Sequence, residues 1–181
     1  NIPTIPQVIA KNHDEFCRLC DLLQSLGWRE INLNMGCPFP MQTGAGRGSG
    51  LLSHADIIEE IFNEMQQRSE ISFSVKMRLG LNNPEESYAL LPMLNDAPLH
   101  HITLHARLGV QQYKGTVSQE AFSHFYDVCR KPLIYNGDIT TVEQIHHLEK
   151  QYPNLKGVMI GRGLLARPTL ALEYQTRELS L

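Results

Sequence analysis

The feature that most constrains the fold is a sixfold alternation of short apolar runs with longer stretches of helical periodicity. Strands that alternate with helices form βαβ units, which build a parallel sheet. The sequence therefore predicts an α/β fold. The runs expected to form strands are Gln7–Ala10, Glu30–Asn34, Ser72–Arg78, His101–His105, Pro132–Asn136 and Gly157–Gly161.

Helix boundaries carry recognisable signals. Asn12 precedes the first amphipathic stretch, and Gly27 follows it as a stop. Two later stretches open on a hydroxyl residue followed three positions on by a polar or acidic residue, which resembles a capping box. These two motifs are Ser53-x-x-Asp56 and Thr141-x-x-Gln144.

Polar residues at the ends of the expected strands decide between two architectures, an open doubly wound sheet and a (β/α)₈ barrel. A barrel gathers all its strand C-termini around one site, whereas an open sheet uses chiefly its switch point. Nearly every strand here ends in polar side chains, which favours the barrel. A full barrel takes about 250 residues, so we expect an incomplete one that forms a single domain over residues 1–181. The start at Asn1, without Met, suggests a segment of a longer protein.

Composition narrows the function classes. The net charge of −3 argues against a basic nucleic-acid-binding domain, and no apolar run is long enough to cross a bilayer. Four cysteines do not make a disulfide framework, and the lone Cys17-x-x-Cys20 lacks a second pair. We therefore expect a cytoplasmic protein without a metal site. Seven basic residues nevertheless fall at or just after strand ends, which predicts one positive face suited to phosphorylated ligands. They are Arg47, Lys76, Arg78, Arg107, Lys114, Arg162 and Arg167.

Cys37 lies at the mouth of a βα loop, between a glycine and a proline that force a fixed turn. A glycine-rich stretch, Gly44–Gly50, follows it. This stretch fits neither the dinucleotide fingerprint nor the Walker A motif, because Ser49 stands where the third glycine would fall and no Gly-Lys-Ser/Thr follows. We expect a flexible loop that leads into a helix rather than a phosphate cradle.

Two glycine-containing strand ends near the C-terminus, Tyr135–Ile139 and Ile160–Gly163, fall in successive loops. Barrels commonly hold phosphate groups between their last two βα loops. Glycines allow close backbone approach, and Arg162 can pair with a phosphate through two donors. Tight turns with one solvated arginine are the alternative reading.

Lys76 and Arg78 alternate with apolar residues, so both point to one face of their strand. In a barrel that face is the interior near its mouth, where a lysine needs an anion or an electron-rich ring. Exposed charges on an edge strand are the alternative. His105 ends the next strand beside Arg107, and its reading as a core residue or as a functional one stays open.

The ordered set of these motifs resembles the tRNA-dihydrouridine synthases, flavoprotein (β/α)₈ barrels that reduce uridine in tRNA. The resemblance runs from Gln7 to about Leu170. Ala106, Asn32 and Gly44 depart from the family's usual residues. The matching motifs are Asn34-x-Gly-Cys-Pro-x-Pro40, Val75-Lys-x-Arg-Leu79, His105-x-Arg107, Gln111-x-Tyr-x-Gly115, Asn136-Gly-Asp138 and Gly161-Arg-Gly163 with Arg167-Pro168.

The resemblance implies FMN as the bound flavin and NADPH, or NADH, as the source of hydride. It makes Cys37 the acid that protonates C5 of the uracil after hydride reaches C6, and thiols are mostly protonated at neutral pH. It implies tRNA as partner, with the target nucleotide turned out of the tRNA fold. Six of eight strands are expected here, without the family's first strands and its C-terminal helical domain.

The resemblance also distributes site residues along the chain. Asn34, Arg78 and Arg107 are implied to bind the substrate. The residues implied to bind the flavin are Gln7, Lys76, His105, Asn136, Gly137, Asp138, Gly161 and Arg162.

Two other functions stay open. One is an FMN barrel that reduces a free pyrimidine, as dihydroorotate- or dihydropyrimidine-type oxidoreductases do. The other is an RNA-binding barrel that has kept the fold and lost the chemistry.

Overall fold

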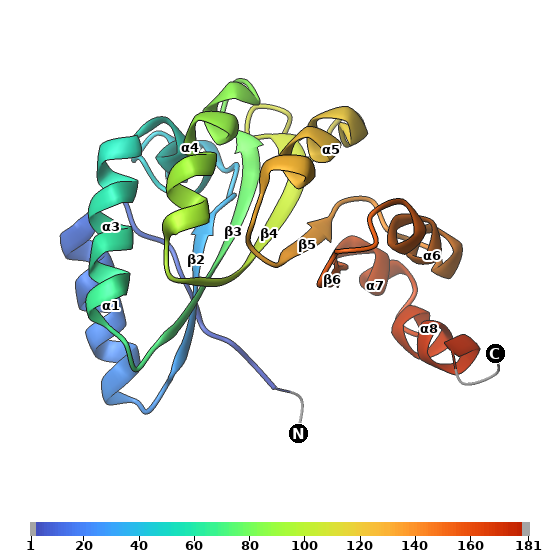
Figure 1. Ribbon diagram of the computed structural model, residues 1–181, viewed down its shortest axis with the longest axis horizontal. Coiled ribbons are helices and arrows are strands. Elements are labelled where there is room, and N and C mark those ends of the chain that lie inside the picture. Colours follow the sequence, from blue (N-terminus) through green and yellow to red (C-terminus); the bar gives the residue numbers. More distant parts are fainter. Residues whose placement is uncertain (1–2, 179–181) are drawn as a thin grey trace.

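The computed structural model describes residues 3–178 and shows a six-stranded parallel sheet whose strands follow one another in chain order. Figure 1 shows α3, α4 and α5 along the outside of the sheet, with α6, α7 and α8 grouped around β6. The strands are β1 (Gln7–Val8), β2 (Glu30–Met35), β3 (Ser72–Gly80), β4 (Leu99–Leu108), β5 (Leu133–Asn136) and β6 (Gly157–Met159). The helices are α1 (His13–Ser25), α2 (Pro40–Thr43), the 3₁₀ helix η1 (Gly48–Ser53), α3 (Ala55–Gln67), α4 (Glu85–Asp96), α5 (Gln119–Val128), α6 (Val142–Gln151), α7 (Arg162–Ala166) and α8 (Leu170–Glu178).

The strand order distinguishes the two architectures. A doubly wound sheet reverses its strand order at a switch point, whereas this sheet runs β1-β2-β3-β4-β5-β6 without reversal. Right-handed crossovers then place the connecting helices on the same side. The expected incomplete barrel is confirmed, and all six expected strands are present. Within residues 3–178 the outer strands β1 and β6 do not pair with each other, so the sheet has two edges.

The hydrophobic core lies between the sheet and its helices. Alternate residues of β2, β3 and β4 point outward and are almost completely buried there. Among them are Leu33, Val75, Met77 and Leu104, each with no exposed surface. This arrangement leaves the other face of the same strands for polar side chains.

The inward residues form layers, because paired residues of parallel strands point to the same side. The lowest layer pairs Gln7 with Asn32, Asn32 with Ser74 and Ser74 with His101. The layers above it bring the expected site residues together. The middle layer contains Asn34, Lys76 and Thr103, and the upper layer contains Arg78, His105 and Asn136.

Three of the four expected helix boundaries are confirmed. Asn12 caps α1 by accepting a hydrogen bond from the backbone N–H of Glu15, and Gly27 follows the helix with a φ of +90°. Thr141 and Gln144 form the expected capping box of α6. These signals are local and were therefore readable from the sequence.

The capping box expected at Ser53 is wrong. The residue before α3 is His54, and no side chain caps that helix. Ser53 instead ends the 3₁₀ helix η1, and its hydroxyl donates to the carboxylate of Glu86 across 3.3 Å. The Ser53 hydroxyl therefore binds a residue distant in sequence instead of the backbone of α3.

No helix within residues 3–178 combines the length and the apolar composition needed to cross a membrane.

Candidate active site

The expected site residues meet in one cleft of about 790 Å³ at the C-terminal ends of the strands. Tyr113, Ile160 and Leu165 also line it. Arg107 alone among the expected residues does not. The eleven that do are Gln7, Asn34, Cys37, Lys76, Arg78, His105, Asn136, Gly137, Asp138, Gly161 and Arg162.

The turn that carries Cys37 is held from three sides. The side-chain oxygen of Asn34 accepts from the backbone N–H groups of Gly36 (3.0 Å) and Cys37 (2.8 Å). The carbonyl of Cys37 accepts from the backbone N–H of Ser49 (2.9 Å) and from its hydroxyl (3.1 Å). Arg78 donates through Nε to the carbonyl of Gly36 at 3.0 Å. The backbone of the turn is therefore fixed without any ligand.

The glycine-rich stretch is packed only at its end: Gly44 and Ala45 are exposed, as expected of a loop, whereas its last three residues are not. Gly48, Ser49 and Gly50 are buried in η1. A Cβ on Gly48 would lie 2.5 Å from the carbonyl oxygen of Cys37, and one on Gly50 would collide with the backbone of Thr43. The glycines are needed because this segment packs directly against the Cys37 turn.

A chain of side-chain amides leads from the turn into the floor of the cleft. The Asn34 amide donates to Gln7 Oε1 at 2.9 Å, and Gln7 donates to Asn32 Oδ1 at 2.7 Å. Asn32 in turn donates to the hydroxyl of Ser74 at 2.9 Å. Gln7 thus contacts two β2 side chains from the short edge strand β1. Within residues 3–178 only one of the two N–H groups of the Asn34 amide is used, so the other can serve a ligand.

Lys76 places a cation in the cleft wall. Burial, and next the neighbouring Arg78 charge, lower the pKa of the Lys76 ammonium to about 8. Within residues 3–178 it forms no ion pair. A half-buried, unpaired cation favours an anion or an electron-rich ring at this position.

Arg78 and Arg107 are buried supports, each only 2% exposed. Besides Gly36, Arg78 donates to the carbonyl of Leu108 at 2.8 Å. The two terminal nitrogens of Arg107 bind the carboxylate of Asp138 at 2.8 and 2.6 Å, and one also donates to Gly115. These donors are used within the protein, and the expected contact of Arg107 with substrate stays a prediction. Arg107 also holds the pKa of the Asp138 carboxyl below its usual range.

His105 is buried and neutral. Burial, with the surrounding cations Arg78, Lys76 and Arg107, lowers the pKa of its imidazole to about 3. Nη1 of Arg107 lies 3.3 Å from Nε2 of His105. An arginine can only donate, so Nε2 is the acceptor and the ring proton resides on Nδ1. His105 therefore offers a neutral N–H donor.

The far end of the cleft is formed by the loops after β5 and β6. Gly137 has a φ of +147°, and a Cβ there would lie 2.5 Å from Val117. Asn136 donates to the carbonyl of Met159 at 2.8 Å and links the two strand ends. A Cβ on Gly161 would meet no heavy atom within 4 Å, so the backbone is open there. The neighbouring Arg162 donates to Asp138 at 3.0 Å.

Tyr113 is a cleft residue that the sequence reasoning did not assign to the site. Its ring lies 5.6 Å from the Arg78 guanidinium and 5.1 Å from that of Arg162, within cation–π range. The side chain is 58% exposed. The sequence did contain a signal that could have assigned Tyr113 to the site, namely an aromatic residue in a polar loop just after a strand.

The expected positive face is partly neutralised. Four of its seven basic residues form ion pairs: Arg47 with Glu15, Arg107 and Arg162 with Asp138, and Arg167 with Glu173. The positive character of the cleft therefore rests chiefly on Lys76 and Arg78.

Solved structures similar to this chain share its fold. The chain superposes on histamine dehydrogenase from Rhizobium sp. 4-9 with a TM-score of 0.67 and 13% identity, over 93% of this chain and 28% of that one. Morphinone reductase in complex with tetrahydroNAD gives a TM-score of 0.65 and 10% identity, over 91% of this chain and 48% of that one. At such identities the likeness concerns the fold alone.

Sequence comparison gives the family. The chain is 31% identical over 170 residues to the tRNA-dihydrouridine(16) synthase of Pseudomonas putida KT2440, covering 93% of this chain and 50% of that protein. The probable tRNA-dihydrouridine synthase of Helicobacter pylori J99 is 33% identical over 142 residues, 76% of this chain and 42% of that protein. The chain spans about half the length of such relatives. The dihydrouridine synthase family model matches residues 1–180, and the chain belongs to that family.

Proposed function

We propose that the protein containing this chain is a tRNA-dihydrouridine synthase, which reduces the C5–C6 double bond of a uridine in tRNA with NADPH or NADH. The observation that carries the proposal is that one cleft holds both a thiol on a hydrogen-bonded turn and a half-buried cation. Cys37 follows β2, Lys76 lies on the adjacent β3, and Asn34 and Lys76 are register partners.

The cleft residues fit FMN. Lys76 is an unpaired cation in the wall and suits an electron-rich ring. Gln7, from the layer below, hydrogen-bonds to Asn34 of the Lys76 layer, and His105, in the layer above, offers a neutral N–H donor. At the far end, Arg162 and the open backbone of Gly161 suit a phosphate group, with Asn136, Gly137 and Asp138 shaping the adjoining loop. A bound flavin, once reduced by NADPH or NADH, supplies hydride for C6 of the uracil.

Cys37 is the proposed acid. Hydride addition at C6 leaves an enolate-like C5, which takes a proton from the thiol. Asn34 and Ser49 hold the Cys37 backbone, and Arg78 holds that of Gly36 beside it, so that the thiol is placed before the substrate arrives. The free N–H of Asn34 is suited to a carbonyl on the uracil edge.

The partner is tRNA, and the target nucleotide must leave its stack to reach Cys37. Arg78 contributes positive charge at the cleft wall, and Arg107 acts through Asp138 rather than by direct contact. We assign the protein to the cytoplasm, where tRNA is modified.

The test incubates the full-length protein with unmodified tRNA, FMN and NADPH, and uses mass spectrometry to look for a uridine that gains two hydrogens. Free uracil and orotate, which both keep the C5–C6 double bond, serve as competing substrates. A gain at one position of tRNA supports the proposal and identifies the position. Turnover of a free pyrimidine with none of tRNA would contradict it, and so would tRNA binding without flavin turnover.

A further inference from the structure

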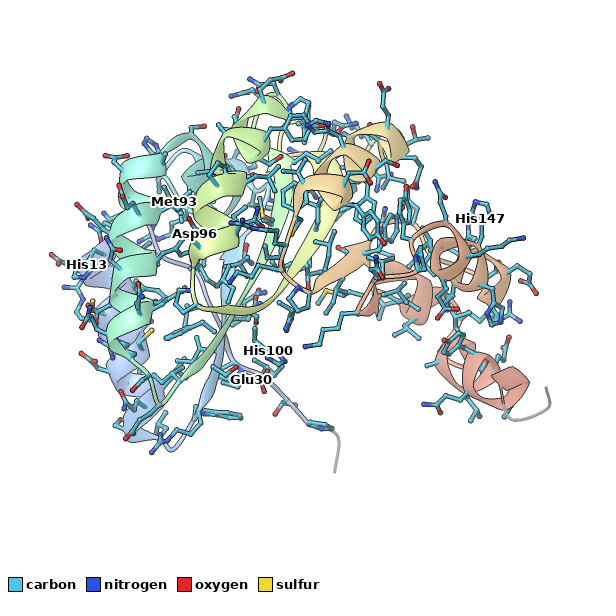
Figure 2. The ribbon with its side chains drawn as sticks, in the orientation of Figure 1. His13, Glu30, Met93, Asp96, His100 and His147 are labelled. Atoms are coloured by element: carbon cyan, nitrogen blue, oxygen red, sulfur yellow. The ribbon has the colours of Figure 1, made fainter. Side chains whose placement is uncertain are left out.

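The Cys17-x-x-Cys20 motif does not act as a pair in the structure. Cys20 is completely buried in the core beneath α1, whereas Cys17 is half-buried on the side of α1 that meets α3. Cys17 lies one helical turn after His13, so both side chains lie on the same face. Glu64 of α3 joins them there, and Figure 2 shows His13 at the outer side of these helices, away from the cleft loops of β5 and β6.

The three side chains have the spacing of a metal-binding set. His13 Nε2 lies 3.3 Å from Glu64 Oε2 and 3.4 Å from Cys17 Sγ. One ligand atom from each residue lies within 4.8 Å of the other two. Tetrahedral zinc bonds imply ligand separations of about 3.4 Å for N···O and about 3.6 Å for N···S. The N···O and N···S distances in the cluster are therefore close to those between the ligands of a tetrahedral zinc ion.

The surrounding groups orient the ligands. His13 Nδ1 lies 3.5 Å from the carboxylate of Asp14 and 3.8 Å from Cys17 Sγ, so an acidic group stands beside the ring nitrogen that is not used for the metal. The second oxygen of Glu64 accepts from Arg68 Nε at 2.7 Å, and Arg68 also donates to Asp21 at 2.7 Å. Glu64 thus keeps Oε2 for the cluster, since its other oxygen is already engaged.

We propose that His13 Nε2, Cys17 Sγ and Glu64 Oε2 bind one Zn²⁺ ion that joins α1 to α3, with water as the fourth ligand. The His13 side chain is 38% exposed, and a surface hollow of about 420 Å³ adjoins it, so an ion and its water can enter. Imidazole, thiolate and carboxylate together suit zinc better than magnesium or calcium. The site is separate from the active-site cleft and from the proposed function.

The test titrates the metal-free, full-length protein with Zn²⁺ against a chromophoric chelator, and with Co²⁺ as a spectroscopic probe. We expect a zinc equivalent whose affinity falls at least tenfold in Cys17→Ser and in His13→Ala. The thiolate-to-cobalt charge-transfer band should disappear in Cys17→Ser. Matched controls are Cys129→Ser, another half-buried free cysteine, and Glu59→Gln, an exposed carboxylate on α3. Both controls should retain the affinity and the band.

Thermal melting separates binding from folding defects. Zn²⁺ should raise the melting temperature of the wild type and of Cys129→Ser, and leave that of Cys17→Ser unchanged, while all three melt alike without metal. The proposal fails if zinc binds equally well after Cys17→Ser and His13→Ala, or if the wild type binds no zinc. Either failure leaves the dihydrouridine assay unaffected, because no cleft residue is altered.

Discussion

The two ends of the cleft are built differently. At the Cys37 end, the backbone of the turn is hydrogen-bonded to Asn34, Ser49 and Arg78, and buried glycines pack against it. At the far end, β6 has three half-buried residues, Gly161 faces open space and the Arg162 side chain is 59% exposed. The proposed acid, Cys37, is therefore placed by a hydrogen-bonded backbone, while the proposed anchoring end relies on exposed side chains.

The largest expected effect is at the rigid end. Cys37→Ala should lower dihydrouridine formation by about 10²–10⁴-fold, the range that general acid catalysis contributes. Flavin should stay bound, because the thiol is not among the groups proposed to hold it. Single-turnover rates and flavin absorbance measure the two quantities, with Cys129→Ser as the control. Full activity in Cys37→Ala would remove the acid role.

Gly48→Ala tests whether packing positions Cys37. Its Cβ would press on the Cys37 carbonyl, and the residue has a φ of +58°. We expect about 2–4 kcal/mol of lost stability and a rate lower by about 10²-fold, as for a misplaced catalytic group. Gly46→Ala is the matched control, since Gly46 has a φ of +74° and no atom within 4 Å of its Cβ. It should cost only the strain, about 1–2 kcal/mol. Equal rates in the two variants would refute the packing argument.

A smaller effect is expected at the open end. Arg162→Ala should weaken FMN retention by about tenfold, because an exposed charge-assisted contact to phosphate is partly screened. Fluorescence titration with FMN measures the affinity. Arg167→Ala removes an exposed arginine that pairs with Glu173 and should leave the affinity unchanged. If both variants bind FMN as the wild type does, the phosphate assignment is wrong.

The smallest effect concerns pH and the neutral imidazole of His105. The folded pKa is about 3 and the unfolded one is about 6.5, so between them only the unfolded state takes up the proton. The free energy of unfolding should therefore fall as the pH drops below about 6.5, by up to about 1.4 kcal/mol per pH unit. His105→Gln should remove this contribution. Denaturant unfolding at pH 7 and pH 5 measures it, and identical slopes in both proteins would contradict a neutral His105.

Local signals were readable from the sequence, and contacts between distant segments were not. The cap of Asn12 and the capping box of Thr141 depend on residues within four positions, and both were predicted correctly. The alternation around Lys76 and Arg78 correctly predicted their shared face. Strand ends gathered eleven of the twelve expected site residues because a parallel sheet brings all its C-terminal ends together.

The errors share a physical cause. Ser53 was assigned to a helix cap but binds Glu86, 33 residues away. Gly48 and Gly50 were expected in a flexible loop, whereas their close contacts with Cys37 and Thr43 require glycine at these positions. In each case a partner distant in sequence decided the role, and no local pattern reports such a partner.

Two backbone N–H groups determine the direction in which the side-chain amides below Cys37 donate their hydrogen bonds. The N–H groups of Gly36 and Cys37 can only donate, so Asn34 must present its oxygen to them and its nitrogen to Gln7. The same logic orients Gln7 toward Asn32, and ends at the Ser74 hydroxyl. Neither Asn34 nor Gln7 can rotate end for end without losing hydrogen bonds on both of its sides, whereas a rotated Asn32 would lose only its bond with Gln7, because the Ser74 hydroxyl can also donate. These hydrogen bonds therefore fix the position of the two-residue edge strand β1 relative to the turn that carries the Cys37 thiol.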